Sequence, residues 1–322
     1  MHEIINKIRP VTDKDKQLPI FSYSKLEVYK NCPMQYKCKY IDKKYTEETS
    51  LALELGSLCH YILEVKGKTK IDGKSIDYEL LDTILHNGSE EEKLTGIDTL
   101  KKKYFETWHE KDNASGMTYE DKIAIFNQIV RSEMEGTEWT PFLFEHPFQF
   151  VWDERAILRG YIDRIDTRIS ADGQIEYKTT DYKTSKKVYD NSKLVTSMQF
   201  GIYALAILNE FHTLPTQSEY RFILLDEAQL ALTKGDENRL IKALDKLFDS
   251  IDKNEKEKIF IPKPSPLCFY CNYCRNNPSA KEHQMSCEYF SLWTPLEKTF
   301  ATNKKWNALE ANRPQASRKL IF

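Results

Sequence analysis

Residues 157–184 read ILRGYIDRIDTRISADGQIEYKTTDYKT. Both halves of this stretch are rich in β-branched and aromatic residues, and Asp172-Gly173 between them is a strong turn signal. The pattern predicts two antiparallel strands, near 158–167 and 175–184. Side chains on a strand alternate between its faces, so Asp181 and Lys183 are expected on the same face.

The chemistry of this hairpin depends on Asp163, Asp181 and Lys183. A carboxylate pair can hold a hard divalent cation, and a lysine can orient or deprotonate a water while offsetting charge on a phosphorane. These three residues therefore predict metal-dependent phosphodiester hydrolysis. The alternative is that they are ordinary solvated charges on a strand.

A second acid-x-lysine motif, Glu176-Tyr177-Lys178, lies on the same expected strand. In an unbroken strand it would face away from Asp181 and Lys183, and only one of the two pairs can face a metal. We choose Asp181 and Lys183 because Thr184 and Ser185 follow them, where the strand should end and a loop should begin.

Two helical patterns accompany the hairpin. Residues 55–64 have helical spacing, with Gly56, His60 and Glu64 on one stripe. Residues 192–211 form a second pattern, in which Gln199 and Tyr203 are one turn apart and project together. A single histidine on a helix, or a tyrosine beside a glutamine, is also common in ordinary cores and surfaces.

In this order the motifs resemble the PD-(D/E)xK nuclease superfamily, and within it the RecB-like branch. That branch includes phage exonucleases and CRISPR adaptation nucleases with an iron-sulfur cluster. The resemblance rests on short motifs spread over residues 21–287: Phe21-Ser22-Tyr23-Ser24, Cys32-Pro33 and Tyr36, Gly56 to His60, Gly160 to Asp163, Asp181 to Thr184, Gln199 to Tyr203, and a terminal cysteine cluster. It implies an α/β, restriction-endonuclease-like core with a mixed β-sheet flanked by helices, plus a helical insertion.

The resemblance also implies roles for individual residues. His60, Asp163 and Asp181 would bind Mg2+ or Mn2+, with help from the backbone carbonyl of Tyr182. Lys183 would be catalytic. Gln199 and Tyr203 would steady the active site and the DNA backbone.

Cysteines form a second group near the C-terminus. Read from spacing alone, Cys268, Cys271, Cys274 and Cys287 can bind one Zn2+ tetrahedrally. The family resemblance implies instead a 4Fe-4S cluster held by Cys32, Cys268, Cys271 and Cys287, which would link the two ends of the domain. The spacing C-x2-C-x2-C-x12-C departs from the family pattern and leaves either Cys274 or Cys287 spare.

Length and composition are sufficient for a folded enzyme with a hydrophobic core. The chain has 322 residues and is 40% hydrophobic, and no apolar run suggests a membrane span or secretion signal. Its net charge of -2 does not exclude DNA as a partner, because phosphate binding depends on where lysines and arginines cluster. The seven cysteines, an odd number, favour the cytoplasm, that of the host if a phage encodes the chain.

We expect four segments and one principal function. The segments are a flexible N-terminus (1–20), a RecB-like nuclease domain (21–290) with a helical insertion at about 66–145, a cysteine-rich metal segment (262–290) and a C-terminal tail (291–322). The tail ends in a basic stretch with Leu320-Ile321-Phe322 and is a candidate contact for a replication or recombination protein. The function expected is an exonuclease on single-stranded DNA or duplex ends in recombination, repair or phage DNA metabolism. The alternative is a catalytically silent nuclease fold that binds DNA or serves as a scaffold.

Overall fold

The computed structural model has two compact units that interleave along the chain. Unit 1 comprises Met1–Phe21 and Thr49–Leu240, and unit 2 comprises Ser22–Glu48 and Ile241–Phe322. The structure describes residues 5–44, 51–71, 124–125, 128–129, 138–185, 187–189, 197–232, 237–265, 267–268, 271–274 and 287.

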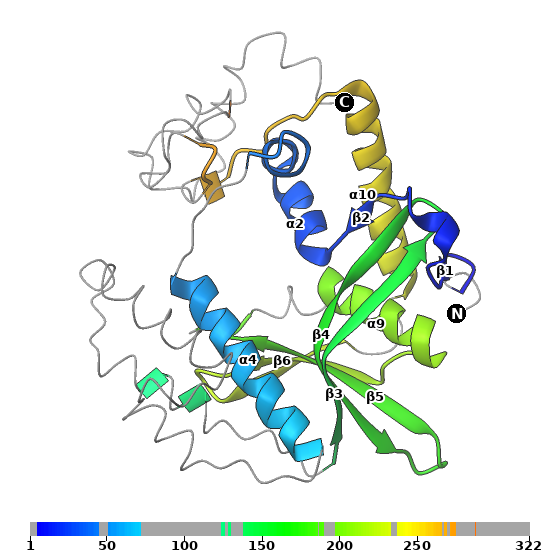
Figure 1. The fold of residues 1–322 in the computed structure, drawn as a ribbon, viewed down its shortest axis with the longest axis vertical. Helices are drawn as coiled ribbons and strands as arrows, with labels where there is room; N and C mark the ends of the chain where they lie inside the picture. Colours follow the sequence, from blue (N-terminus) through cyan, green and yellow to red (C-terminus); the bar gives the residue numbers. More distant parts are fainter. Residues whose placement is uncertain are drawn as a thin grey trace. The chain divides into compact units, whose positions relative to one another are not determined.

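A mixed sheet forms the centre of unit 1 (Figure 1). Its order is β1-β3-β4-β5-β6-β7, with β2 paired to β4. Pairs β2–β4 and β5–β6 are parallel, and the others are antiparallel. Helices α4 (Leu51–Ile71) and α9 (Met198–Phe211) flank the sheet, which confirms the expected fold class. The strands are β1 (Ile8–Arg9), β2 (Ile20–Phe21), β3 (Thr140–Trp152), β4 (Ala156–Ile169), β5 (Ile175–Lys183), β6 (Gln217–Phe222) and β7 (Glu227–Leu232).

The hairpin expected from residues 157–184 is confirmed by the antiparallel pairing of β4 and β5. In its turn, the Gly173 N–H donates to the Ser170 carbonyl at 3.0 Å. Gly173 has a φ of 80°, a left-handed conformation that a residue with a Cβ rarely adopts. The turn signal in the sequence therefore has a direct backbone cause.

The N-terminal segment, expected to be flexible over 1–20, contributes two short strands to the sheet. β1 pairs with β3, β2 pairs with β4, and an Arg9–Asp15 ion pair at 2.7 Å lies between them. Strands of two residues carry no periodicity, so no local pattern could indicate them.

Strand β3 begins at Thr140. Pro141 and Pro147 weaken the strand signal because a proline cannot donate to the ladder. Residues 140–145, expected in the helical insertion, are therefore part of the sheet. Most of that insertion and the whole tail, 291–322, lie outside the described residues.

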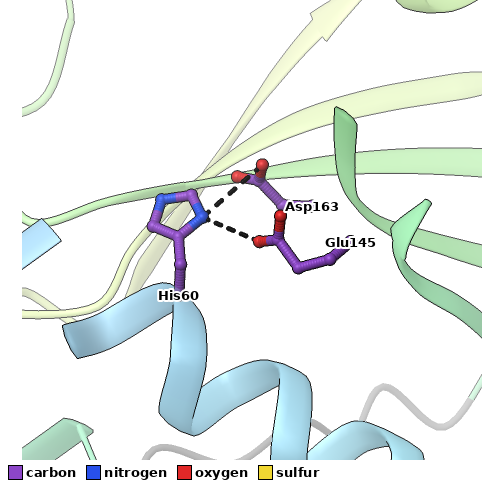
Figure 2. Close-up of side chains that lie close together, drawn as sticks. All are labelled: His60, Glu145 and Asp163. Atoms are coloured by element: carbon purple, nitrogen blue, oxygen red, sulfur yellow. Dashed lines mark hydrogen bonds and ion pairs between the residues drawn. The ribbon is translucent and has the colours of Figure 1, made fainter. Parts of the chain in front are cut away.

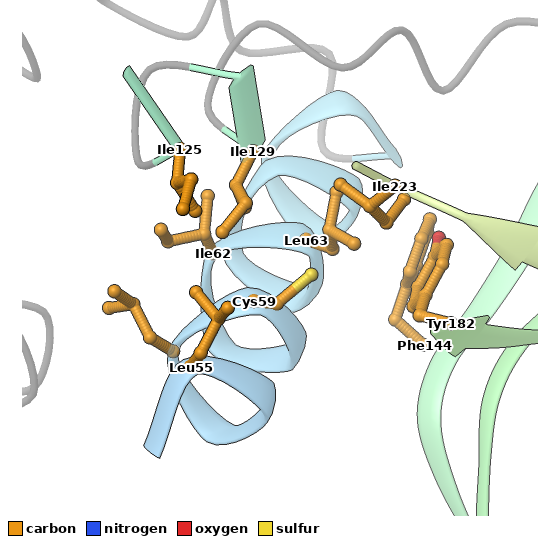
Figure 3. Packing of buried hydrophobic residues seen from close by; sticks show 10 residues of the cluster. Leu55, Cys59, Ile62, Leu63, Ile125, Ile129, Phe144, Tyr182 and Ile223 are labelled. Atoms are coloured by element: carbon orange, nitrogen blue, oxygen red, sulfur yellow. The ribbon is translucent and has the colours of Figure 1, made fainter. Parts of the chain in front are cut away.

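Helix α4 packs its apolar side against β3 and β5 (Figure 3). Leu58, Cys59 and Ile62 are at most 1% exposed in a cluster that includes Phe144 and Tyr182. A Cβ added to Gly67 of this helix would lie 2.1 Å from the Phe144 ring. The glycine permits the close approach of α4 to β3.

Helix α9 begins and ends with identifiable caps. Ser197 accepts a hydrogen bond from the Phe200 N–H at its N-terminus, and His212 ends it in a left-handed conformation. The helix contacts β1 and β3. The expected start near residue 192 lies outside the described residues, and Gln199 and Tyr203 fall in the first turns.

Unit 2 is built from the two ends of the domain. Its helices are α2 (Tyr23–Asn31), α3 (Pro33–Tyr36), a π-helical turn (Lys37–Ile41) and most of α10 (Glu237–Glu257). The hydroxyl of Tyr29 lies 2.8 Å from Ser250 Oγ and accepts a hydrogen bond from Asn254 Nδ2 at 2.7 Å. Tyr36 donates to Glu255 at 2.9 Å. These contacts join α2 and α3 to α10.

Among the described residues, no helix combines the length and apolar character needed to cross a membrane.

Candidate active site

The candidate active site lies where β4 and β5 part. Their ladder ends at the pair Arg164 and Thr180, one step before Asp163 and Asp181. The other pairings of the two strands continue past that point, because Asp181 pairs with Tyr220 of β6 and Ile162 pairs with His146 of β3. The Tyr182 N–H donates to Asp163 Oδ2 at 2.8 Å. A side-chain carboxylate of β4 thus accepts a backbone hydrogen bond from β5 just past the end of their ladder. This register places the two predicted acids level on adjacent strands.

Asp181 is held from both sides. Its Oδ2 is 2.5 Å from Lys183 Nζ, and its Oδ1 accepts from Gln199 Nε2 at 2.5 Å and from Tyr203 Oη at 3.4 Å. Gln199 also donates to Tyr203 Oη at 3.1 Å. The structure thus brings four predicted residues together, and a carboxylate with this many partners has little freedom to rotate.

The side chains of Gln199 and Tyr203 point at Asp181. Tyr203 is 4% exposed, whereas Gln199 is half-buried. The geometry is that of residues that orient a carboxylate. Their predicted contact with the DNA backbone stays a prediction.

His60 projects from α4 toward two carboxylates (Figure 2). Its Nδ1 is 3.1 Å from Glu145 Oε1 and 3.6 Å from Asp163 Oδ1. One ligand atom from each residue lies within 4.8 Å of the others. An imidazole and carboxylate oxygens at this spacing suit a divalent cation such as Mg2+ or Mn2+.

Glu145 is a site residue that the sequence motifs do not include. On β3 it lies between Phe144, opposite Arg164, and His146, opposite Ile162, and is therefore level with Asp163. Its φ of 43° is left-handed, which is uncommon in a strand. The available signal was an acid that interrupts the apolar run Phe142-Leu143-Phe144. Because Glu145 falls inside the expected helical insertion, that signal did not lead to its inclusion in the site.

The backbone at Glu145 reverses the side-chain alternation of β3. Phe144 packs against α4, but His146, two residues later, contacts Glu210 of α9 at 2.8 Å. In a regular strand both would face the same side. The left-handed residue between them explains how the Glu145 carboxylate reaches His60.

Burial and crowded charges shift the pKa values in the site. Burial lowers the pKa of His60, but the Glu145 hydrogen bond and the Asp163 charge outweigh it and raise the pKa to about 9. Burial raises the pKa of Asp163, and the neighbouring charge of Asp181 raises it further. Burial also lowers the pKa of Lys183, but Asp181 more than compensates, so the lysine stays an ammonium. A cation bound between these acids would reduce the repulsion between their negative charges.

Tyr182 contributes in two ways. Its N–H binds Asp163, and its side chain is buried in the cluster under α4, 6.1 Å between ring centroids from His60. The predicted use of its carbonyl as a ligand stays a prediction.

The rejected pair, Glu176 and Lys178, has other partners. Glu176 accepts from Arg168 at 2.6 Å, and Lys178 lies 3.2 Å from Asp166 and 3.3 Å from Glu219. Both charges are compensated by neighbouring strands, as expected of structural residues.

The cysteines meet in a pocket of unit 2. Its lining includes the four residues predicted to bind a 4Fe-4S cluster, Cys32, Cys268, Cys271 and Cys287. Cys274, a ligand of the alternative zinc site, also lines the pocket, as do Pro262 and Pro264. The backbone N–H groups of Lys263 and Ser265 donate to Cys32 Sγ and Cys268 Sγ, each at 3.4 Å. Hydrogen bonds of this kind favour a thiolate, the form that binds metals.

The thiols of this pocket influence one another. Burial raises the pKa of Cys271 to about 12, and Cys32, Cys268 and Cys287 add to that rise. A hydrogen bond with Cys274 raises the pKa of Cys268. The thiols are therefore close enough to interact, and metal binding here would have to displace their protons.

Comparisons with known proteins find curated relatives and a matching family model. Curated relatives include an ATP-dependent helicase/deoxyribonuclease subunit of Clostridium perfringens strain SM101, 29% identical over 232 residues. The same protein from strain ATCC 13124 is 26% identical over 229 residues. Each match covers 63% of this chain but 19% of the relative. The chain thus spans about a fifth of these relatives.

A family model described as the PD-(D/E)XK nuclease superfamily matches residues 20–276. That range includes His60, Glu145 and both hairpin acids, and members of this superfamily use divalent metals to cleave nucleic acids. The chain belongs to the PD-(D/E)XK nuclease superfamily.

Proposed function

We propose that the protein is a Mg2+- or Mn2+-dependent deoxyribonuclease that acts as an exonuclease on single-stranded DNA or duplex ends. The observation that carries the proposal is the level placement of Asp163 and Asp181 where β4 and β5 part, with Lys183 against Asp181. Superfamily membership and relatives named as helicase/deoxyribonuclease components support it.

Each residue of the site has a distinct task in this proposal. His60, Asp163 and Asp181 would hold the cation, with the Tyr182 carbonyl. The cation supplies charge neutralisation at the phosphate and activation of water. Lys183, as an ammonium, offsets negative charge that develops on the phosphate. Gln199 and Tyr203 keep the Asp181 carboxylate in one orientation through the hydrogen bonds described above.

The exonuclease activity and a place in recombination, repair or phage DNA metabolism rest on the RecB-like resemblance. We also propose a cytoplasmic location, because free thiols and a DNA substrate suit a reducing compartment. A partner that binds the tail at 291–322 remains part of the proposal.

A degradation assay tests the activity. With Mg2+ or Mn2+, linear single-stranded DNA and duplex ends should be degraded and covalently closed circles spared. Rapid nicking of closed circles would indicate an endonuclease instead. DNA binding without any cleavage would favour the silent scaffold.

We further propose that Cys32, Cys268, Cys271 and Cys287 hold a 4Fe-4S cluster. All four of these cysteines line one pocket of unit 2, which brings Cys32 to the C-terminal cysteines. The alternative is Zn2+ on Cys268, Cys271, Cys274 and Cys287, all of which also line the pocket. Metal analysis of anaerobically purified protein separates the two, since iron with brown thiolate-to-iron absorption supports the cluster and one zinc without iron rejects it.

A further inference from the structure

We infer that Glu145 is a direct ligand of the active-site cation, beside His60 and Asp163. The inference rests on the proposed metal-dependent function and adds a residue outside the motifs that led to it. It makes the cation site one imidazole with three carboxylates, from α4, β3, β4 and β5.

The distances match a shared coordination sphere. Adjacent oxygen or nitrogen ligands on an octahedral cation, each about 2.1 Å from the metal, are about 3.0 Å apart, and opposite ligands are about 4.2 Å apart. His60 Nδ1 lies 3.1 Å from Glu145 Oε1 and 3.6 Å from Asp163 Oδ1. One ligand atom from each of the three residues falls within 4.8 Å of the other two, so one cation can reach all three residues with small adjustments.

The position of the histidine nitrogens argues against a purely indirect role. A carboxylate that only orients a metal-binding histidine takes one ring nitrogen and leaves the other for the metal. Here Glu145 and Asp163 approach the same nitrogen, Nδ1. A cation placed between His60 Nδ1 and Asp163 therefore also lies beside Glu145.

Exposure is consistent with cation entry from the Glu145 side. The side chains of Glu145 and His60 are 23% and 33% exposed, whereas that of Asp163 is 7% exposed. The buried aspartate is already bound to the Tyr182 N–H. Glu145 is the more accessible carboxylate at which a cation would first arrive.

Mn2+ titration of the full chain, followed by calorimetry and by the Mn2+ electron paramagnetic resonance signal, tests the inference. Glu145→Gln should weaken Mn2+ binding at least about tenfold, the low end of the effect seen when groups outside the ligand set are removed. The matched control is Glu210→Gln, which removes the negative charge from another histidine–glutamate contact next to β3, at 2.8 Å, and should leave binding unchanged.

A His60→Ala background distinguishes a direct ligand from a residue that acts only by positioning His60. If Glu145 acted only through His60, Glu145→Gln would have no further effect in a His60→Ala protein. A direct ligand predicts that it weakens Mn2+ binding in both backgrounds. Should Glu145→Gln fail to fold, Glu145→Asn removes the carboxylate with a residue that accepts left-handed backbone more readily.

The outcomes distinguish this inference from the proposed function. If the wild type binds Mn2+ and cleaves DNA but Glu145→Gln binds equally well, the inference is overturned and the function stands. An effect seen only when His60 is present also overturns it. A wild type that binds no Mn2+ and cleaves no DNA with Mg2+ or Mn2+ overturns both.

Discussion

The acidic site and the cysteine pocket are assembled in different ways. Asp163 and Asp181 come from neighbouring strands, and the protein supplies partners for both through Tyr182, Lys183 and Gln199. The cysteine pocket joins segments far apart in the chain, as the contact between Lys263 and Cys32 across 231 positions shows. Its Cys32 and Cys268 sulfur atoms accept long backbone hydrogen bonds.

Because of this difference, the acidic site should matter mainly for activity and the cysteine pocket mainly for stability. Strand register fixes the acidic site, so its residues can be replaced at little cost to the fold. The cysteine pocket is formed by segments that are far apart in the chain. A metal bound there would link these segments and so add to the stability of unit 2. Substitutions in the two regions should therefore have different consequences.

The largest effect is expected at the acidic site. Asp181→Ala should abolish metal-dependent cleavage, and Lys183→Ala should reduce it at least about a hundredfold, because each removes a charge needed in the transition state. Thermal unfolding should change little. Cleavage rates on end-labelled DNA measure this.

Glu176→Ala is the matched control for Asp181→Ala, because it removes an acid of the same strand that pairs with Arg168. It should stay active. If Glu176→Ala were inactive and Asp181→Ala active, the choice between the two acid-x-lysine motifs would be wrong.

At the cysteine pocket, Cys32→Ser should remove the metal centre and lower the melting temperature by several degrees, since the link between the two segments is lost. Iron and zinc content and thermal unfolding are the measurements. Cys38→Ser provides the control, because Cys38 is 1% exposed and does not line the pocket. Full metal content in Cys32→Ser would exclude Cys32 as a ligand and support the local zinc site.

A smaller effect is expected at Gly67 of α4, which is not one of the proposed metal ligands. Gly67→Ala should destabilise the protein by about 1–3 kcal/mol because the new Cβ overlaps the Phe144 ring. In the same helix, Gly56→Ala meets nothing within 4 Å. That control should gain up to about 1 kcal/mol from helix propensity. Urea unfolding of both variants gives the comparison, and equal stabilities would contradict the packing argument.

The smallest effect should come from Tyr203→Phe. It removes a hydroxyl that holds Asp181 at 3.4 Å, a hydrogen bond worth about 0.5–1.5 kcal/mol, so cleavage should slow by roughly twofold to tenfold. Single-turnover rates at saturating metal measure the change. A loss as large as that of Asp181→Ala would show that Tyr203 does more than orient the carboxylate.

Local sequence signals were sufficient for part of the fold. The β4–β5 hairpin could be predicted because strand composition, a left-handed glycine turn and the alternation of side chains all act over a few residues. The same alternation put Asp181 and Lys183 on one face, and the structure has them in contact. The two-residue strands β1 and β2 could not be predicted, because their only support is pairing with distant strands.

The sequence by itself determined the hairpin, the superfamily resemblance and the residue types suited to a divalent cation. Only the tertiary structure decided that β4 and β5 separate at Asp163 and Asp181, and that β3 brings Glu145 to the same level. The physical reason is that strand register and a left-handed residue depend on packing against α4 and α9, which no local pattern encodes. Tertiary packing also gathered the cysteines, since proximity across the whole domain is a property of the folded chain.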